Sequence, residues 1–563
     1  MSRVFTVDLR TLALFRVCFG FILLADLVSR STDLVDHYTD RGVLPTEAAR
    51  TALNEFGFSL HLLNGSVYFQ ASLFVVAGVF AIALILGYRT RLSSMVSWIL
   101  LASLNHRNYH VLQSSDTLML CLLFWSMFLP LGARFSVDGT LNKEERGANT
   151  HCSFASAALV IQVLSVYFFG ALLKTSPAWV PDGNAVYFAL HYDAYASRLG
   201  IWAGGLPVEL LRYVTYFVYY VELFGSILIL SPWFNYRFRL TLIPLLVMMH
   251  IGFALLLAVG NYPYLSITSL MVLIPGKLWD DLGNRRASLQ RPTVKFYYDG
   301  PCDFCRKVCL ILRELLALRR SPVLPADSLA EIRQLLDEHN SWVIEDSHGQ
   351  RYVRWPAMVT VFEHSPIFSP VSRLLGQRHA LALGERLYAS IASNRDALSR
   401  LTGIVLPYRA NRIRLPLAVD LIAGGLLFLV LLSNVTGLKK VTFENPWTFA
   451  RTLTALSLNQ NWTMFTPQPG NLSRWLFVEG KLADGAGHYA SYRWRKYFHS
   501  EHVRKRWPQL GRYYCLRWNE RHAAKPVVEV TAYLLIQRTR RTTADTEPLY
   551  TQRVDILGYR DCK

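Results

Sequence analysis

Long apolar stretches alternate with short polar segments along most of this chain. A membrane-spanning helix needs about 20 mostly apolar residues, and three of the nine stretches are short enough to be re-entrant. The pattern therefore predicts eight or nine transmembrane helices. The first stretch contains Arg16 and Asp26 and is followed by no small-residue cleavage site, so we expect it to be retained. The nine predicted spans are 11–29, 67–87, 92–105, 116–132, 153–174, 210–230, 240–259, 264–275 and 415–436.

The Lys and Arg residues between the spans predict how the helices are oriented. Short cytoplasmic loops are enriched in these residues, and the loops 88–91, 133–152 and 235–239 each carry two or more of them. With the N-terminus inside, nine spans place 276–414 in the cytoplasm and everything after 437 outside. We therefore expect a multi-pass protein of the cell's inner (plasma) membrane.

Two long polar segments interrupt this pattern and predict extramembrane domains. Strand-like and helical patterns alternate in the first, whereas the second shows the period-2 alternation of strands, from residue 459 onward, with an Asp-Gly hairpin signal. The predicted fold class is a polytopic α-helical membrane bundle with an inserted α/β domain and a C-terminal β-rich extramembrane domain. The predicted boundaries are 1–285 for the membrane domain, 292–403 for the inserted domain, 415–436 for the last transmembrane helix and 438–563 for the β-rich domain.

A pair of cysteines two residues apart opens the inserted domain. The stretch VKFYYDGPCDFCRKV (294–308) ends a strand-like run in Asp-Gly, and a helical pattern follows Cys302 and Cys305. A strand, a turn carrying CxxC and a helix form the thioredoxin-like arrangement. Unpaired N–H groups at a helix N-terminus stabilise a thiolate. We therefore expect Cys302 to be the nucleophile and Cys305 the resolving thiol.

Other interpretations of this pair remain open. A zinc site would need two more ligands at finger-like spacing, but His339, His348 and His364 are scattered, so no metal site is predicted. The two cysteines could also be incidental thiols. Cys309 lies a turn further along the helix, as a packed thiol or a third redox partner.

The segment 292–403 resembles the DCC-type thiol-disulfide oxidoreductase-like domains. The resemblance is carried by YYDGPCDFC (297–305), VIEDSHGQRYVRWPAM (343–358) and GERLYASIASNRDALSRL (384–401). It implies a thioredoxin-like fold and a redox role. In a cytoplasm the pair would rest largely reduced, because glutathione opposes stable disulfides there.

Several ionisable residues stand in or beside the apolar stretches. Lys174 closes one of them and is followed by Trp179, as a snorkelling lysine beside an aromatic anchor or as a desolvated base. His250 lies within another, where an ionisable group is costly and usually functional, although a hydrogen-bonded core histidine is the alternative. A further polar group at an outer membrane end completes the predicted ligand pocket. Its members are His106, Arg107, Asn108 and Asp116.

The membrane part resembles the HTTM domain, which is shared with vitamin K-dependent gamma-carboxylases. The resemblance spans about 8–281 and is carried by the segment with His106 and Asp116, FWSMFLPLGARFSVDG (124–139), the run 162–188 and the helix of His250. It implies that Lys174 stands where the carboxylases carry their proposed catalytic base. It also implies a quinone, vitamin K-like, as the candidate cofactor. No glutamate-rich substrate or propeptide-binding segment is identifiable, and the CxxC domain departs from the carboxylase pattern.

Composition and charge indicate which classes of molecule the chain binds. Hydrophobic residues make up 52 % of the chain and the net charge is +19. No basic helix with interleaved aromatics stands apart from the spans, so membrane lipids rather than nucleic acid are the expected partner. The segment 438–563 carries 21 Lys and Arg against 10 Asp and Glu, concentrated in 493–499 and 502–507, which indicates a surface facing lipid headgroups or an acidic peptide. Cys515 and Cys562 could bridge on an oxidising side.

Three functions follow from these features. The leading one is an integral membrane thiol-disulfide oxidoreductase, acting on a thiol, disulfide or peptide client that the sequence does not identify. The second is a carboxylase-like or other peptide-modifying enzyme with Lys174 as base. The third is a non-enzymatic membrane maturation factor.

Overall fold

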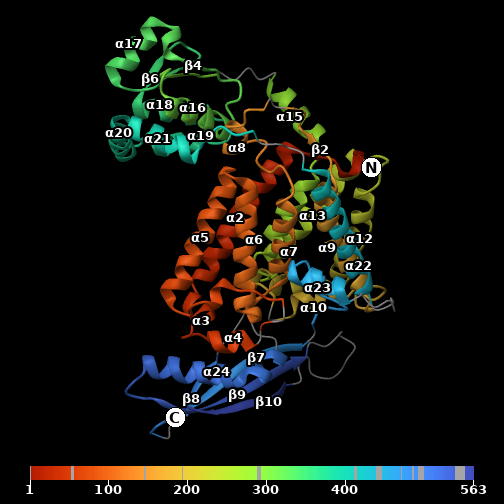
Figure 1. Ribbon diagram of the computed structural model, residues 1–563. Coiled ribbons are helices and arrows are strands. Elements are labelled where there is room, and N and C mark those ends of the chain that lie inside the picture. The colour runs from red at the N-terminus through yellow and green to blue at the C-terminus, as the bar shows by residue number, and fades with distance from the viewer. Residues whose placement is uncertain are drawn as a thin grey trace.

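A computed structural model describes the chain in three parts: a helical bundle, an α/β module at one end of it and a β-sheet domain at the other (Figure 1). The module and the sheet domain are separated by the length of the bundle. The structure describes all residues except 1, 52, 54–55, 145–146, 193–194, 288–292, 411–414, 439–446, 471, 485–486, 492–499, 539–551 and 563.

Each of the nine predicted spans contains a helix of the bundle. Five of these helices (α2, α5, α9, α13 and α22) are long and apolar enough to cross a membrane. The chain is thus a mostly helical membrane protein, whereas the count of eight or nine spans stays a prediction. The bundle helices are α2 (Leu9–Ser31), α5 (Val67–Leu86), α6 (Thr90–Arg107), α7 (Ser114–Ser126), α9 (Phe154–Leu173), α12 (Val208–Ile229), α13 (Asn235–Leu256), α14 (Tyr262–Leu270) with a 3-10 turn over Met271–Leu273, and α22 (Leu417–Thr436).

Short elements join the bundle helices at both ends. The loop between α2 and α5 carries three of them and packs against the end of α6. These short elements are α1 (Ser2–Phe5), β1 (Val7–Asp8), α3 (Leu34–Tyr38), α4 (Thr46–Thr51), a 3-10 turn over Leu60–Leu62, another over Tyr109–Val111, α8 (Val137–Thr140), β2 (Thr150–His151), α10 (Ala185–Leu190), α11 (Arg198–Gly204), α15 (Gly276–Ala287) and α23 (Trp447–Ala455).

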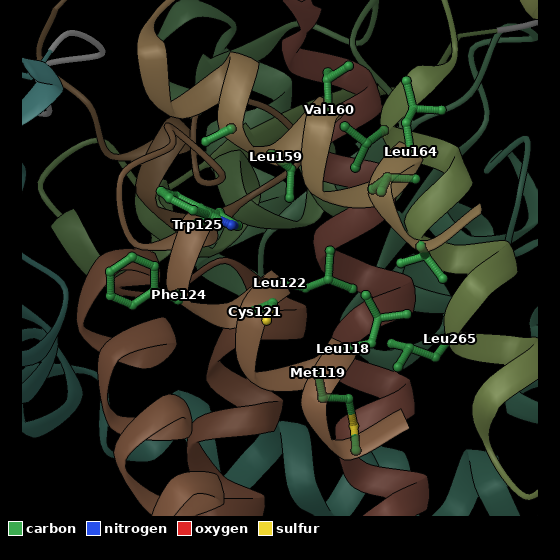
Figure 2. Packing of buried hydrophobic residues seen from close by; sticks show 14 of the residues in the cluster. Leu118, Met119, Cys121, Leu122, Phe124, Trp125, Leu159, Val160, Leu164 and Leu265 are labelled. Carbon is green, nitrogen blue, oxygen red and sulfur yellow. The ribbon is translucent and has the colours of Figure 1, made fainter. Parts of the chain in front are cut away.

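Helix α9 lies at the centre of the bundle. In its most apolar window 78 % of the residues are buried within the protein, against 22 % in α5, α13 and α22. Trp125 of α7 is fully buried against α9 and donates a hydrogen bond from Nε1 to Gln162 (3.2 Å). Figure 2 shows the surrounding Leu, Val and Phe side chains filling this space. A central helix enclosed in this way fixes the positions of the residues at its end.

Contacts at the module end show how the chain runs through the bundle. Thr11, in the first turns of α2, donates to the carbonyl of Ile274 just after α14 (3.1 Å). The N–H of Ala155, at the start of α9, donates to Asp420 at the start of α22 (3.2 Å). The chain therefore leaves the bundle for the module and returns from it at the same end. Helix α22 then carries the chain to the sheet domain at the opposite end (Figure 1).

The α/β module is a four-stranded sheet flanked by helices. The strand order is β4-β3-β5-β6, with β3 and β4 parallel and the other pairs antiparallel. Helix α16 crosses over between the two parallel strands. The elements are β3 (Lys295–Tyr298), α16 (Asp303–Leu315), β4 (Val323–Pro325), a 3-10 turn over Ala326–Ser328, α17 (Ala330–His339), β5 (Val343–Glu345), β6 (Arg351–Val353), α18 (Arg354–Glu363), α19 (Ser369–Leu375), α20 (Arg378–Ser393) and α21 (Arg395–Val405).

Helix α16 also anchors the module to the bundle. Its buried Glu314 accepts a hydrogen bond from the backbone N–H of Phe135 (3.0 Å), and Arg319 lies over the Phe135 ring (4.2 Å to its centroid). The carbonyl of Phe135 accepts a hydrogen bond from Arg16 of α2 (2.6 Å). Phe135 is thus contacted by charged side chains from both the module and the bundle.

The C-terminal domain is an antiparallel sheet in the order β10-β9-β7-β8, covered by α24. A disulfide joins Cys515 to Cys562, and Arg517 pairs with Asp36 of the bundle. The run 459–470, which alternation predicted as strand, contains no strand, because its aromatic side chains insert into the bundle instead. The basic run 493–499 lies outside the described residues. The elements are β7 (Leu472–Leu482), β8 (Gly487–Ser491), α24 (Ser500–Arg521), β9 (Val527–Arg538) and β10 (Gln552–Asp561).

Candidate functional site

A cavity of about 300 Å³ lies inside the bundle, at the end nearer the sheet domain. Helices α9, α12, α13 and α14 form its walls, and the run 459–470 closes it with Trp462, Met464 and Phe465. Trp462 is almost fully buried. Most of the lining is apolar, as in pockets that bind hydrophobic small molecules. The few polar groups in the cavity therefore determine what it can do.

Lys174 and Glu222 form a buried ion pair in this cavity. Lys174 caps the C-terminal end of α9, and its ammonium donates to the carboxylate of Glu222, which lies within α12. The side chains are only 5 % and 9 % exposed. The Lys174 ammonium also lies 5.0 Å from the centroid of the Trp179 ring. A lysine that is buried and paired in this way is not a snorkelling residue.

His250 lies on α13 in the wall of the same cavity. Its Nε2 is 2.8 Å from the hydroxyl of Tyr167, and the rings of Phe253 and Tyr262 pack around it. In the part of the chain that the structure describes, its buried Nδ1 has no hydrogen-bond partner. Buried polar atoms are nearly always hydrogen-bonded. The free nitrogen is therefore a position where a bound molecule can make a polar contact.

The cavity has a side facing the lipid, between α12 and α13. Val214 of α12 and Met248 of α13 line it and are themselves 38 % and 53 % exposed. Gly252 lies one turn beyond Met248, and a Cβ atom added there would meet no atom within 4 Å. These partly exposed residues define the lateral opening of the cavity.

The four remaining predicted pocket residues lie elsewhere. Three of them fasten the loop between α2 and α5 to the end of α6 through its backbone carbonyls. His106 bonds to Phe58 (2.9 Å), Arg107 to Leu44 (2.8 Å) and Asn108 to His37 (2.9 Å). Asp116 accepts from the N–H of Gln113 (2.6 Å) and pairs with Arg30. The structure thus brings Lys174, Trp179 and His250 together and places these four in the scaffold.

Sequence analysis missed several residues of the cavity. Glu222 stands within the apolar stretch 210–230, and an intramembrane carboxylate is a functional candidate by the same rule that singled out His250. The sequence alone could therefore have identified Glu222 as a candidate. Trp462 and Tyr167 carried none, because an aromatic residue in an apolar run is ordinary core.

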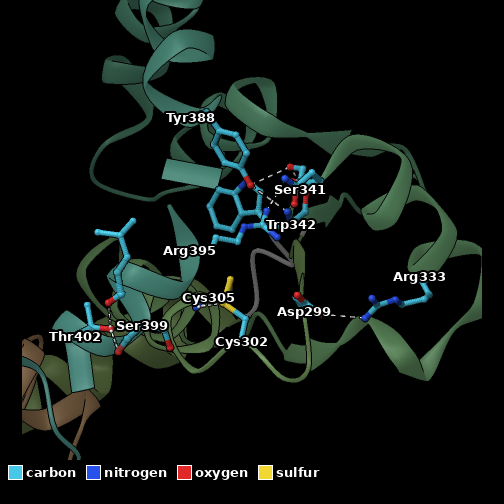
Figure 3. The surroundings of a disulfide bond; sticks show 12 residues. Asp299, Cys302, Cys305, Arg333, Ser341, Trp342, Tyr388, Arg395, Ser399 and Thr402 are labelled. Atoms are coloured by element: carbon cyan, nitrogen blue, oxygen red, sulfur yellow. Dashed lines mark hydrogen bonds and ion pairs between the residues drawn. A yellow bond between two sulfur atoms is a disulfide. The ribbon is translucent and has the colours of Figure 1, made fainter. Parts of the chain in front are cut away.

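Cys302 and Cys305 lie at the N-terminus of α16 and are joined as a disulfide. Cys302 is the N-cap residue, and the N–H of Cys305 points at its sulfur (3.1 Å). The N–H of Cys302 donates to the carbonyl of Asp299 (2.9 Å), whose carboxylate is held by Arg333 (3.0 Å). Figure 3 shows this turn beneath Tyr388, which hydrogen-bonds Ser341 and Trp342.

Exposure separates the three cysteines of α16. Cys302 and Cys305 are partly exposed, whereas Cys309 is 1 % exposed. Burial raises the pKa of the Cys309 thiol to about 12, so it stays protonated near neutral pH. No group of three or more His, Cys, Asp or Glu side chains that could hold a metal ion occurs among the described residues. Of these three cysteines, only Cys302 and Cys305 are accessible to solvent.

The two sites lie toward opposite ends of the bundle. The CxxC pair belongs to the module, which adjoins the beginning of α9, and Lys174 follows the end of α9 (Figure 1). The 20 residues of α9 span about 30 Å at 1.5 Å per residue. Atoms at the two sites cannot react with each other directly.

Bundle and cavity together define the class, an integral membrane protein. Residues 5–277 match the HTTM domain family. The matched segment contains Lys174, Glu222 and His250. The match supports the resemblance of this part of the chain to the carboxylase-like membrane proteins. No curated protein and no solved structure matches the chain. The resemblance of 292–403 to DCC-type domains stays a prediction.

The buried pair predicts an asymmetry between single and double substitutions. Glu222→Gln leaves the Lys174 ammonium buried without its carboxylate, at a cost of about 3–5 kcal/mol. Adding Lys174→Met removes the stranded charge and restores most of the stability. Denaturant unfolding in detergent measures both variants. The control is Asp280→Asn, which breaks the exposed pair with Arg10 (side chain of Asp280 62 % exposed) and costs about 1 kcal/mol or less. Equal losses for Glu222→Gln and the control would contradict the pairing.

Proposed function

We propose that this chain is a membrane-bound thiol-disulfide oxidoreductase whose reaction takes place at Cys302 and Cys305. The observation that carries the proposal is the position of the pair. Cys302 caps α16, and a backbone N–H of the first turn points at its sulfur, which stabilises a thiolate. The strand order with α16 crossing between parallel strands supports the thioredoxin-like assignment of the module.

The proposed reaction is dithiol–disulfide exchange. The Cys302 thiolate attacks one sulfur of a client disulfide, and the other client sulfur leaves as a thiolate. Cys305 then displaces the client from the mixed disulfide, so the client gains two electrons and the module keeps the disulfide. A small thiol such as glutathione supplies the electrons that reduce the pair again.

The side of the membrane fits this direction of electron flow. We propose that the module faces the cytoplasm of the plasma membrane, where thiol reductants are abundant. The sheet domain then lies outside, where a disulfide such as Cys515–Cys562 is stable.

Reduction of a disulfide by the purified full-length protein tests this function. With glutathione as electron donor and a fluorescent peptide disulfide as client, Cys302→Ser should lose more than about 99 % of the activity, because no nucleophile remains. Cys305→Ser should accumulate the mixed disulfide, visible by mass spectrometry. Cys309→Ser is the matched control on the same helix and should stay active. Activity that survives Cys302→Ser, or that disappears only with Cys309→Ser, would contradict the proposal.

A second function is favoured by the cavity. We propose that it binds a quinone or another lipid-soluble ligand, which enters between α12 and α13 and places a polar atom near His250 Nδ1. A quinone supplies redox chemistry when bound, and the apolar lining with few polar groups fits it. Proton transfer from Lys174 to Glu222 would leave a neutral amine that accepts a proton from a ligand hydroxyl. That is the base role which the carboxylase resemblance implies.

Closing the lateral opening tests the cavity. Gly252→Leu places a side chain in open space at the opening, so the fold stays intact while the affinity for a short-chain ubiquinone falls about tenfold or more, a loss of about 1.4 kcal/mol. Quenching of Trp179 and Trp462 fluorescence reports binding. The control is Gly425→Leu on α22, which also has open space and does not line the cavity. Unchanged affinity in Gly252→Leu, or no quenching in the unaltered protein, would refute the ligand site.

A further inference from the structure

A second large cavity lies where the module joins the bundle. It measures about 530 Å³ and is bounded by the start of α6, by the loop 129–142 and by the linker 405–410 that leads from the module back to the membrane. Four arginines line it, Arg89, Arg91, Arg134 and Arg409. This cavity belongs neither to the CxxC pair nor to the Lys174 cavity.

Among the described residues of its lining, Asp138 is the one carboxylate, and its oxygens already accept hydrogen bonds. Asp138 accepts hydrogen bonds from the N–H groups of Arg89 and Thr90 (2.8 Å each) and from the Thr90 hydroxyl (3.0 Å). It caps α6 and does not hold the Arg89 guanidinium, whose buried Nε has no hydrogen-bond partner among the described residues. The described lining therefore holds four arginines against one carboxylate.

Backbone conformation at Arg89 also points to a specific role. Its φ is +44°, a left-handed conformation that a residue with a side chain adopts at a cost. The Asp138 contacts hold it there, and the guanidinium lies 5.5 Å from the centroid of the Tyr88 ring. Tyr88 in turn donates from its hydroxyl to the carbonyl of Val405 in the linker (2.7 Å).

Exposed apolar side chains lie in the lining of this cavity and next to it in the chain. Leu92 lines the cavity and is 44 % exposed, Met95 further along α6 is 47 % exposed, and Ile404, beside the lining residue Val405, is 76 % exposed. A cationic hollow above an exposed apolar surface matches the two halves of a phospholipid, a charged headgroup and acyl chains.

We propose that this cavity binds the phosphate-bearing headgroup of an anionic phospholipid, with the acyl chains along the exposed face of α6. The bound lipid contacts both the loop 129–142 and the linker 405–410, so it fastens the module to the bundle. Anionic lipids of the leaflet on the module side supply the ligand, and basic pockets at this level of a membrane protein bind such headgroups.

Lipid binding by the full-length protein tests the proposal. We expect native mass spectrometry from mixed micelles to show phosphatidylglycerol retained at least about tenfold better than phosphatidylcholine. Arg409→Glu should reduce that retention about tenfold or more, because it reverses one charge at the rim. Arg89→Gln should reduce it too, while Arg237→Gln, an exposed arginine on α13 outside the cavity, should not. Size-exclusion chromatography shows that each variant is folded.

A competition experiment distinguishes a lipid headgroup from free inorganic phosphate as the ligand. Inorganic phosphate at 10 mM, about a thousandfold above the lipid, should leave phosphatidylglycerol bound, since it lacks the acyl chains. Displacement of the lipid by inorganic phosphate would overturn the proposal in favour of a free phosphate ligand. Equal retention of the two lipids, or loss of retention in Arg237→Gln alone, would also overturn it.

Discussion

A charge inside a bilayer needs a partner, and this requirement shapes the bundle. An isolated charge in hydrocarbon costs several kcal/mol or more, and the buried ions Lys174, Arg30 and Arg16 each bond to a group on another segment. Lys174 at the end of α9 pairs with Glu222 of α12, and Arg30 of α2 pairs with Asp26 and with Asp116 of α7. Arg16 donates from its two terminal nitrogens to the backbone carbonyls of Leu131 and Phe135. These contacts join helices that are distant in the chain, and the pair between α9 and α12 lies in the lining of the cavity.

The hydrocarbon layer that makes unpaired charges costly also separates the CxxC pair from the Lys174 cavity. The CxxC pair and the Lys174 cavity lie beyond opposite ends of α9, so electrons can pass between them only through a carrier that crosses the membrane. The module and the bundle are instead connected by hydrogen bonds. Glu314 of α16 accepts a hydrogen bond from the backbone N–H of Phe135, and Arg16 of the bundle donates to the Phe135 carbonyl. The run 459–470 makes a corresponding connection at the other end, where Gln460 bonds to Gln162 of α9 (2.7 Å).

Sequence patterns predicted the bundle helices and, in the cavity, the polar residues Lys174 and His250. A lysine or histidine in an apolar run is expensive, so Lys174 and His250 stood out without any knowledge of their partners. The group around His106 was misplaced, because its partners are backbone carbonyls in the loop 32–66 and such bonds leave no trace in side-chain identity. The strand expected over 459–470 was wrong because alternating aromatic residues suit a segment wedged between helices as well as a sheet. Pairing across 298 positions, as between Gln162 and Gln460, is visible only in the fold.

Side-specific labelling in sealed, oriented vesicles tests the central claim that one bundle carries two sites facing opposite sides of the membrane. After reduction of the module, a membrane-impermeant maleimide is applied from either side to a variant with Thr175→Cys, an exposed position beside Lys174. Mass spectrometry of the peptides then identifies each labelled residue. The account predicts that Cys302 reacts only from one side and the cysteine introduced at Thr175 only from the other. Labelling of both from the same side would contradict it.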